Sequence, residues 1–266
     1  MEAFEFATDT VDLHLDYHLV GRGQPVVMLH ARPFVSWYTP LADALPGWSI
    51  LRYHRTVRTG GAEFRIEDDA AAVAALLRHV GFDRAHVVGH SYGGLVALAL
   101  AIHDGSTVRS LGLLEPAGTG FLPRSEAEAA MAPTLATYRA HGAEAGIDQF
   151  LALVAGDRYR PVLDRAAPGA FDDAVAHAAQ FFDVEWPAVA QWVCAADDVA
   201  PIAQPVLNVI GGDSSIRFSR VADLIQGWLP HAVRQTINGT NHLLIADQPR
   251  AVAACLETFW NSLGPS

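Results

Sequence analysis

The chain has 266 residues, of which 51% are hydrophobic and 18% are charged. This size and composition predict a soluble protein with one large α/β domain, or with a core domain that carries an insertion. The formal net charge of −11, from 18 basic and 29 acidic residues, disfavours nucleic acid or an anionic membrane as the main partner. Two cysteines are too few for a disulfide framework or a cysteine-based metal cluster.

Neither a secretion signal nor a membrane segment is expected. Residues 1–5 lack the basic region followed by an apolar run that marks a secretory signal. The longest apolar run, residues 95–102, is too short to span a bilayer. We therefore expect a cytoplasmic protein that acts on a small-molecule substrate, and a homodimer is compatible with this sequence.

The first half of the chain alternates predicted strands and helices. Residues 11–17 alternate apolar and polar side chains, as a half-exposed antiparallel strand does. Residues 26–29 are continuously apolar, which predicts a strand buried on both faces, and residues 49–53 form a third candidate strand. Residues 68–81 carry apolar side chains at helical spacing, with acidic residues around the first turn.

The second half continues this pattern with one long interruption. Strands are predicted at residues 84–88, 108–114, 205–210 and 233–237, and a patterned helix closes the chain. Between about residues 116 and 201 the pattern is helical only, and it begins with a capping box at residues 125–128. Alternating strands and helices predict a parallel sheet covered on both faces. The interrupting helices should lie over the carboxyl ends of its strands.

A candidate nucleophile lies between the strand at residues 84–88 and the apolar helix that follows. The sequence there is Gly89-His90-Ser91-Tyr92-Gly93. A Gly-x-Ser-x-Gly between a strand and a helix is typical of a nucleophile elbow, in which small residues permit a sharp reversal of the chain. The serine hydroxyl is then held out where the first free N–H groups of the helix favour negative charge. We predict that Ser91 is a nucleophile.

A serine hydroxyl needs a base within hydrogen-bond reach, and that base must be oriented by a third group. Among the twelve histidines, His242 lies in a short loop rich in Asn and Gly, directly after the last predicted strand. This loop should lie at the same edge of the sheet as the elbow. We therefore predict that His242 is the base.

These segments resemble the α/β-hydrolase superfamily over nearly the whole chain. The resemblance rests on Leu29-His30 after the first buried strand, the elbow, the interrupting helices and the loop of His242. It implies an eight-stranded, mostly parallel sheet flanked by helices, with a helical cap inserted after the sixth strand. Residues 1–118 and 201–266 would form the core domain, and residues 119–200 the cap. The usual activity of the family is hydrolysis of an ester, thioester, lactone or amide through an acyl-enzyme, without metal or organic cofactor.

The third member of the triad departs from the usual pattern. The family usually places an acid at the position of Ser214, which cannot carry the charge, and Asp213 lies one residue early. Some members take the acid from the end of the sixth strand, where this chain has Glu115. An isolated carboxylate after an apolar strand would be costly without a hydrogen-bonding partner. We favour Glu115 as the acid and keep Asp213 as the alternative.

The resemblance also implies how the site is lined. The backbone N–H groups of Arg32 and Tyr92 would form an oxyanion hole. Here the chain reads His30-Ala31-Arg32, where the family usually has His-Gly. Aromatic side chains of the cap favour a mostly apolar acyl or aromatic substrate. The expected substrate-binding residues are His30, Arg32, Phe34, Trp37, His90, Phe181, Phe182 and Trp186.

Four arginines, Arg32, Arg52, Arg55 and Arg58, cluster around two predicted strand ends of an otherwise acidic chain. One interpretation is a binding site for a substrate carboxylate, which a planar guanidinium suits. Ordinary pairing with surface acids is the interpretation that we favour.

The leading hypothesis is a serine hydrolase that acts on a small or medium, largely apolar ester or lactone. A second hypothesis uses the same residues for carbon–carbon bond cleavage, a lyase or cyclase step, or cofactor-free peroxidation, because one fold hosts many chemistries. A third is a non-catalytic ligand-binding homologue, which the departures at Arg32 and Ser214 would favour. A serine in the elbow, where those enzymes have aspartate, disfavours epoxide hydrolase and haloalkane dehalogenase activity.

Overall fold

The computed structural model describes residues 2–8, 11–59 and 63–264, and the side chains of Arg58 and Thr59 lie outside this description. Its centre is an eight-stranded sheet with the strand order β1-β2-β4-β3-β5-β6-β7-β8. The β1–β2 and β2–β4 pairs are antiparallel and all the other pairs are parallel. The strands are β1 (Glu2–Ala7), β2 (Val11–Val20), β3 (Pro25–Leu29), β4 (Ser49–Thr59), β5 (Ala85–His90), β6 (Val108–Leu114), β7 (Val206–Gly211) and β8 (Val233–Ile237). The predicted α/β fold with a mostly parallel sheet is confirmed.

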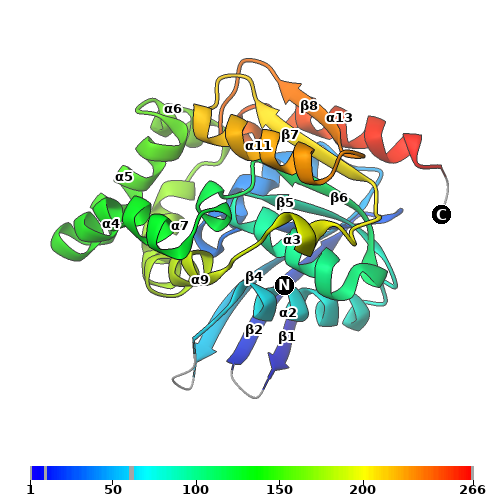
Figure 1. Ribbon diagram of the computed structural model, residues 1–266, viewed down its shortest axis with the longest axis horizontal. Helices are drawn as coiled ribbons and strands as arrows, with labels where there is room; N and C mark the ends of the chain where they lie inside the picture. Colours follow the sequence, from blue (N-terminus) through cyan, green and yellow to red (C-terminus); the bar gives the residue numbers. More distant parts are fainter. Residues whose placement is uncertain (1, 9–10, 60–62, 265–266) are drawn as a thin grey trace.

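Helices connect the strands and flank the sheet (Figure 1). Helix α3 packs on β3, β5 and β6 and against α2, whereas Leu256 and Trp260 of α13 contact β6 and β5. The connecting elements are η1 (Arg32–Tyr38), α1 (Thr39–Asp43), α2 (Ile66–His79), α3 (Tyr92–Asp104), η2 (Gly105–Thr107), α11 (Ile216–Trp228), α12 (Leu244–Asp247) and α13 (Pro249–Ser262). Their apolar faces and the parallel strands form the buried core.

The antiparallel edge is larger than the sequence predicted. Strand β4 was expected to end near residue 53, but it continues to Thr59 and pairs with β2 from Ile50 to Thr59. Strand β1 was not predicted. In the register of β2 and β4, Arg55 lies opposite Leu15, and both side chains are fully buried. A charged residue at a buried position interrupted the apolar alternation, so the strand was predicted too short.

All regular elements between β6 and β7 are helical in this fully described stretch, and we call them the cap helices. They are η3 (Gly118–Phe121), α4 (Arg124–His141), α5 (Ala143–Ala155), α6 (Tyr159–Ala166), α7 (Ala170–Ala176), α8 (Ala178–Gln180), η4 (Phe181–Glu185), α9 (Trp186–Gln191) and α10 (Ala196–Val199). Figure 1 shows them in green to yellow, mostly gathered at one side of the sheet. Helix α4 begins at Arg124 with Pro123 at its N-cap, so Ser125 does not cap the helix as predicted.

Candidate active site

Ser91 lies between β5 and α3 in a strained backbone conformation, with φ 53° and ψ −119°. Only glycine fits at two flanking positions. A Cβ atom on Gly89 would lie 2.2 Å from the carbonyl oxygen of Gly93, and one on Gly93 would lie 1.9 Å from the carbonyl oxygen of Leu29. The local sequence therefore builds the elbow that was predicted, with Ser91 at the start of a helix. Strained backbone of this kind clusters at functional sites.

Glu115 follows β6 in a second left-handed conformation, with φ 46°. Its side chain is fully buried, and both oxygens of its carboxylate are hydrogen-bonded. Oε1 accepts hydrogen bonds from the Gly211 N–H at 2.7 Å and the Ser214 hydroxyl at 2.5 Å. Oε2 lies 2.8 Å from Nδ1 of His242. These three groups compensate the cost of burying the charge.

The structure thus places Glu115, and not Asp213, against His242. Asp213 is exposed at the end of β7, and its backbone N–H donates to the carbonyl oxygen of Thr240 at 2.9 Å. The residue at the family's usual acid position, Ser214, instead donates to the carboxylate of Glu115.

The His242 ring is held between two other rings. Phe218 of α11 stacks on it with a centroid distance of 4.2 Å and an interplanar angle of 15°. His90 lies 4.5 Å away on centroids, and its Nε2 contacts the carbonyl oxygen of His242 at 2.9 Å. Burial, with a further contribution from His242, lowers the pKa of His90 well below its ordinary value, so His90 is neutral at pH 7. Because Nδ1 of His242 faces a carboxylate, the proton belongs on Nδ1 and Nε2 is left to accept one.

A small cavity of about 20 Å³ contacts both Ser91 and His242. This volume holds roughly one water molecule. The residues that line it are His30, Ala31, Phe34, Trp37, His90, Ser91, Phe150, Phe181 and His242. Five of the predicted substrate-binding residues are therefore at the cavity, whereas Arg32, Phe182 and Trp186 do not line it.

Cap aromatics form the roof of this cavity. Phe150 of α5 stacks on Phe34 at 5.7 Å, and Phe181 of η4 meets both rings edge-on. Phe182 and Trp186 pack behind Phe181, with centroid distances of 5.0 and 5.5 Å. Sequence reasoning did not select Phe150, because an aromatic on the apolar face of a helix looks like any core residue.

The predicted arginine cluster does not form one site. Arg32 directs its guanidinium to Nδ1 of His54 at 2.9 Å, and Arg52 donates to the hydroxyl of Thr39. The side chain of Arg58 lies outside the described part of the structure. Arg55 is fully buried, so the expectation of pairing with surface acids is wrong for this residue.

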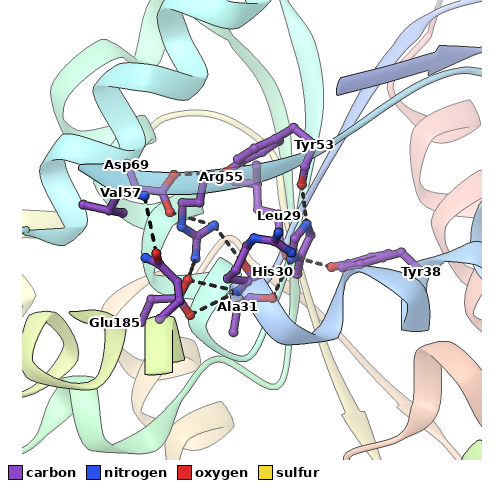
Figure 2. Close-up of polar contacts among 11 residues, drawn as sticks. Leu29, His30, Ala31, Tyr38, Tyr53, Arg55, Val57, Asp69 and Glu185 are labelled. Carbon is purple, nitrogen blue, oxygen red and sulfur yellow. Dashed lines mark hydrogen bonds and ion pairs between the residues drawn. The ribbon is translucent and has the colours of Figure 1, made fainter. Parts of the chain in front are cut away.

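Arg55 is the centre of a buried charge network (Figure 2). Its guanidinium lies 3.1 Å from Asp69 of α2 and 2.6 Å from Glu185 of η4, and all three side chains are fully buried. It also donates to the carbonyl oxygen of His30 at 3.0 Å. Burial raises the pKa of Glu185 to about 7, although Arg55 and the Arg32 N–H partly oppose this rise. Sequence reasoning did not find this network, because its members are far apart in the chain.

Glu185 also accepts a hydrogen bond from one of the two backbone N–H groups that were predicted to form the oxyanion hole. The backbone N–H of Arg32 donates to Oε1 and Oε2 of Glu185, at 3.0 and 3.1 Å. In this structure the donor is therefore engaged by a side chain of the cap helices.

A larger and shallower groove of about 640 Å³ lies away from Ser91, along Gln24, Arg84, Arg109 and Pro205. These residues mark the amino-terminal starts of parallel strands, whereas ligands of open α/β sheets bind at the carboxyl ends. The cavity at Ser91 is therefore the better candidate site.

The described residues offer no candidate membrane span and no candidate metal site. No helix among them is both long enough and apolar enough to cross a membrane. Within the same residues, no group of three or more His, Cys, Asp or Glu side chains is arranged to hold a metal ion.

A serine elbow, a histidine and a buried carboxylate on a sheet of this topology define an α/β-hydrolase. A family model described as alpha/beta hydrolase fold matches residues 24–249, and the chain belongs to this family. A 2-hydroxy-6-oxo-2,4-heptadienoate hydrolase from Pseudomonas putida is 30% identical over an alignment of 119 residues, and the match covers 41% of this chain and 43% of that protein. The chain thus spans less than half the length of the curated relatives it matches.

Solved structures share the fold over nearly the whole chain. An esterase from Thermogutta terrifontis superposes with a TM-score of 0.81 at 16% identity, with 100% of each chain covered. The enol-lactonase from Burkholderia xenovorans LB400 gives a TM-score of 0.78 at 18% identity and covers 94% of this chain and 97% of its own.

Proposed function

We propose that the protein is a serine hydrolase that cleaves a small or medium, largely apolar carboxylic ester or lactone through an acyl-enzyme. One observation carries this proposal: Nδ1 of His242 lies 2.8 Å from the buried carboxylate of Glu115, and the His242 ring lines the same cavity as Ser91. Nucleophile, base and orienting acid thus meet at the carboxyl ends of β5, β6 and β8.

In the proposed reaction, Ser91 Oγ attacks the carbonyl carbon while Nε2 of His242 takes the hydroxyl proton. Glu115 stabilises the imidazolium that forms. The N–H groups of Tyr92 and Arg32 would hold the oxyanion of the tetrahedral intermediate. The carbon–oxygen bond of the alcohol then breaks, and His242 returns the proton to the leaving oxygen. A water molecule, activated by the same histidine, hydrolyses the acyl-serine and releases the acid.

The lining of the cavity supports an apolar and uncharged acyl group. Four of its nine lining residues are the apolar aromatics Phe34, Trp37, Phe150 and Phe181. Burial, together with Arg55, lowers the pKa of His30 to about 3, so its ring is neutral at pH 7. Lysine and arginine are missing from the lining that the structure describes, which disfavours a substrate carboxylate at this position.

Hydrolysis of a carbon–carbon bond is the second candidate. It is favoured by the curated relatives, several of which are named as hydrolases of 2-hydroxy-6-oxo dienoates. We rank it below ester hydrolysis because those substrates carry a carboxylate, and none of the described residues that line the cavity is a lysine or an arginine. We also propose that residues 119–200 act as a cap that encloses the substrate.

Active-site labelling tests the proposal. The protein is incubated with a fluorophosphonate probe, and the adduct is located by mass spectrometry. We expect a single adduct on Ser91 that disappears in Ser91→Ala and becomes at least about 100-fold slower in His242→Ala. His103→Ala, which changes an exposed histidine, is the matched control and should label like the wild type. A folded protein that does not label at Ser91 would refute the proposal.

Turnover assays then separate the two candidates. Short-chain 4-nitrophenyl esters and δ-lactones are compared with a 2-hydroxy-6-oxo dienoate under the same conditions. A higher kcat/KM for the esters or lactones supports the leading proposal, and a higher value for the dienoate supports the second candidate.

A further inference from the structure

Glu185 ends a π-helical turn, η4, whose first residue is Phe181. Phe181 lines the cavity at Ser91, and Glu185 contacts Arg32 at the start of η1. A π-helical turn inside a helical segment is often found at a functional site, because its wider turn redirects the side chains. One short segment of the cap helices thus contacts both the cavity and the predicted oxyanion donor.

The contact between Glu185 and Arg32 resembles the interaction that a reacting substrate would need. Both carboxylate oxygens lie within 3.1 Å of the Arg32 backbone nitrogen. A hydrogen bond from a backbone N–H to a carboxylate is stronger than one to a neutral oxygen. A substrate carbonyl oxygen can use this N–H only if Glu185 gives it up.

The charge network allows Glu185 to leave. The three buried charged side chains are one cation, Arg55, and two acids, Asp69 and Glu185. The cluster therefore contains one carboxylate more than is required to neutralise the guanidinium. If Glu185 withdraws from the network, Arg55 remains paired with Asp69 at 3.1 Å. Withdrawal therefore does not leave the buried guanidinium without a partner, which would be strongly destabilising.

We propose that Glu185 is an internal ligand of the oxyanion hole, bound to the Arg32 N–H in the free enzyme and displaced from it by the reacting carbonyl oxygen. This inference rests on the proposed function, since it assigns the Arg32 N–H to the oxyanion. It adds a residue of the cap helices to the active site. The cavity has room for only about one water, so a substrate can enter only if its lining moves. A shift of η4 would move Phe181 out of the cavity and, at the same time, move Glu185 away from the Arg32 N–H.

The surroundings of Glu185 make its strength as a hydrogen-bond acceptor depend on pH near neutrality. Burial raises its pKa to about 7, so the carboxylate gains a proton, and becomes a weaker acceptor, as the pH falls below neutrality. The charged and titratable groups that interact with it come from η1, β4, α2 and α3. They are Arg32, Tyr53, Arg55, Asp69 and Tyr92. Displacement should therefore be easier at pH 6 than at pH 8.

The first test compares second-order rate constants for labelling of Ser91 by a fluorophosphonate, whose phosphoryl oxygen needs the same donors. Glu185→Gln replaces the carboxylate with a neutral and weaker acceptor. We expect labelling to become faster by on the order of tenfold, which is the scale of the difference between charged and neutral hydrogen bonds. Glu185→Ala should show an increase at least as large if it folds.

Asp69→Asn is the matched control. It removes the other carboxylate from Arg55 and so perturbs the same buried network, but Asp69 does not contact the Arg32 N–H. We expect Asp69→Asn not to accelerate labelling. Equal acceleration in Asp69→Asn and Glu185→Gln would overturn the inference, because it would mean that charge alone sets the rate. Unchanged or slower labelling in a folded Glu185→Gln would overturn it as well.

A crystal structure of the phosphonylated wild-type protein provides a second test that does not depend on variants. We expect the phosphoryl oxygen to lie within hydrogen-bond distance of the Arg32 nitrogen, with Glu185 moved away. An adduct on Ser91 in which Glu185 still binds the Arg32 N–H would overturn the inference and leave the proposed function intact. If Ser91 is labelled in neither the wild type nor the variants, the proposed function fails and the inference fails with it.

Discussion

The hydroxyl of Ser214 donates to Oε1 of Glu115 at 2.5 Å, and so links the ends of two neighbouring strands, β6 and β7. Ser214 stands where the family usually carries its triad acid. In this chain the buried carboxylate lies instead at the end of the neighbouring strand, β6, and Ser214 donates a hydrogen bond to it. Gly211, at the end of β7, adds a second donor through its backbone N–H.

Removal of the Ser214 hydroxyl should weaken the acid without deleting it. In Ser214→Ala, Glu115 keeps the Gly211 N–H but loses a charge-assisted hydrogen bond, so we expect kcat/KM for an ester substrate to fall roughly tenfold. Ser215→Ala, one residue along and exposed, is the control and should be indistinguishable from the wild type. Equal activities of all three proteins would show that Ser214 does not support the acid.

The identity of the acid can be tested by moving it. Glu115→Gln should lose roughly 100- to 10,000-fold in kcat, as acid variants of such triads do, whereas Asp213→Asn should stay close to the wild type. Adding Ser214→Asp to Glu115→Gln returns a carboxylate to the family's usual position and should recover part of the loss. A large loss in Asp213→Asn would contradict the assignment of Glu115.

The roof of the cavity should set the length of the acyl group. In Phe181→Ala, the ratio of kcat/KM for 4-nitrophenyl hexanoate to that for the acetate should rise at least about tenfold, since even one further methylene that fits an apolar pocket contributes ~1 kcal/mol or more. Phe182→Ala removes a ring of the same size that packs behind Phe181 and does not line the cavity. It should cost about 3–5 kcal/mol of stability and leave the ratio unchanged. A similar rise in both variants would show that the effect is loosening of the cap helices.

Glu185 should make stability depend on pH in a defined direction. Its pKa is raised from 4.5 to about 7 in the folded protein, so between these values the folded state holds a proton that the unfolded state has lost. The stability that this bound proton gives the folded state is fully present below about pH 4.5. It is lost as the pH rises to about 7, where the free energy of unfolding has fallen by on the order of 3 kcal/mol. Between pH 5 and pH 7, the free energy of unfolding of the wild type, measured in urea, should therefore fall relative to that of Glu185→Gln. Parallel curves for the two proteins would contradict the raised pKa.

The parallel part of the fold could be predicted from the sequence because its strands are continuously apolar and its helices are amphipathic. The end of β4 could not, since a buried arginine at position 55 reads as a surface residue until Asp69 and Glu185 are seen around it. In the same way, Ser91, His242 and Glu115 follow from the places they take at strand ends. The candidate site also includes Phe150, Phe218 and Glu185. These residues belong to it through contacts with partners distant in the chain, and no local sequence pattern indicates such contacts.

The surplus carboxylate has a consequence for chimeras between members of this family. A foreign cap without an acid at the position of Glu185 would leave this core with a balanced Arg55–Asp69 pair, and the core should accept it. Moving these cap helices onto a core that lacks the arginine would bury Glu185 without a cation, which is strongly unfavourable. This core should therefore accept the cap of another family member more readily than another core accepts the cap helices of this chain.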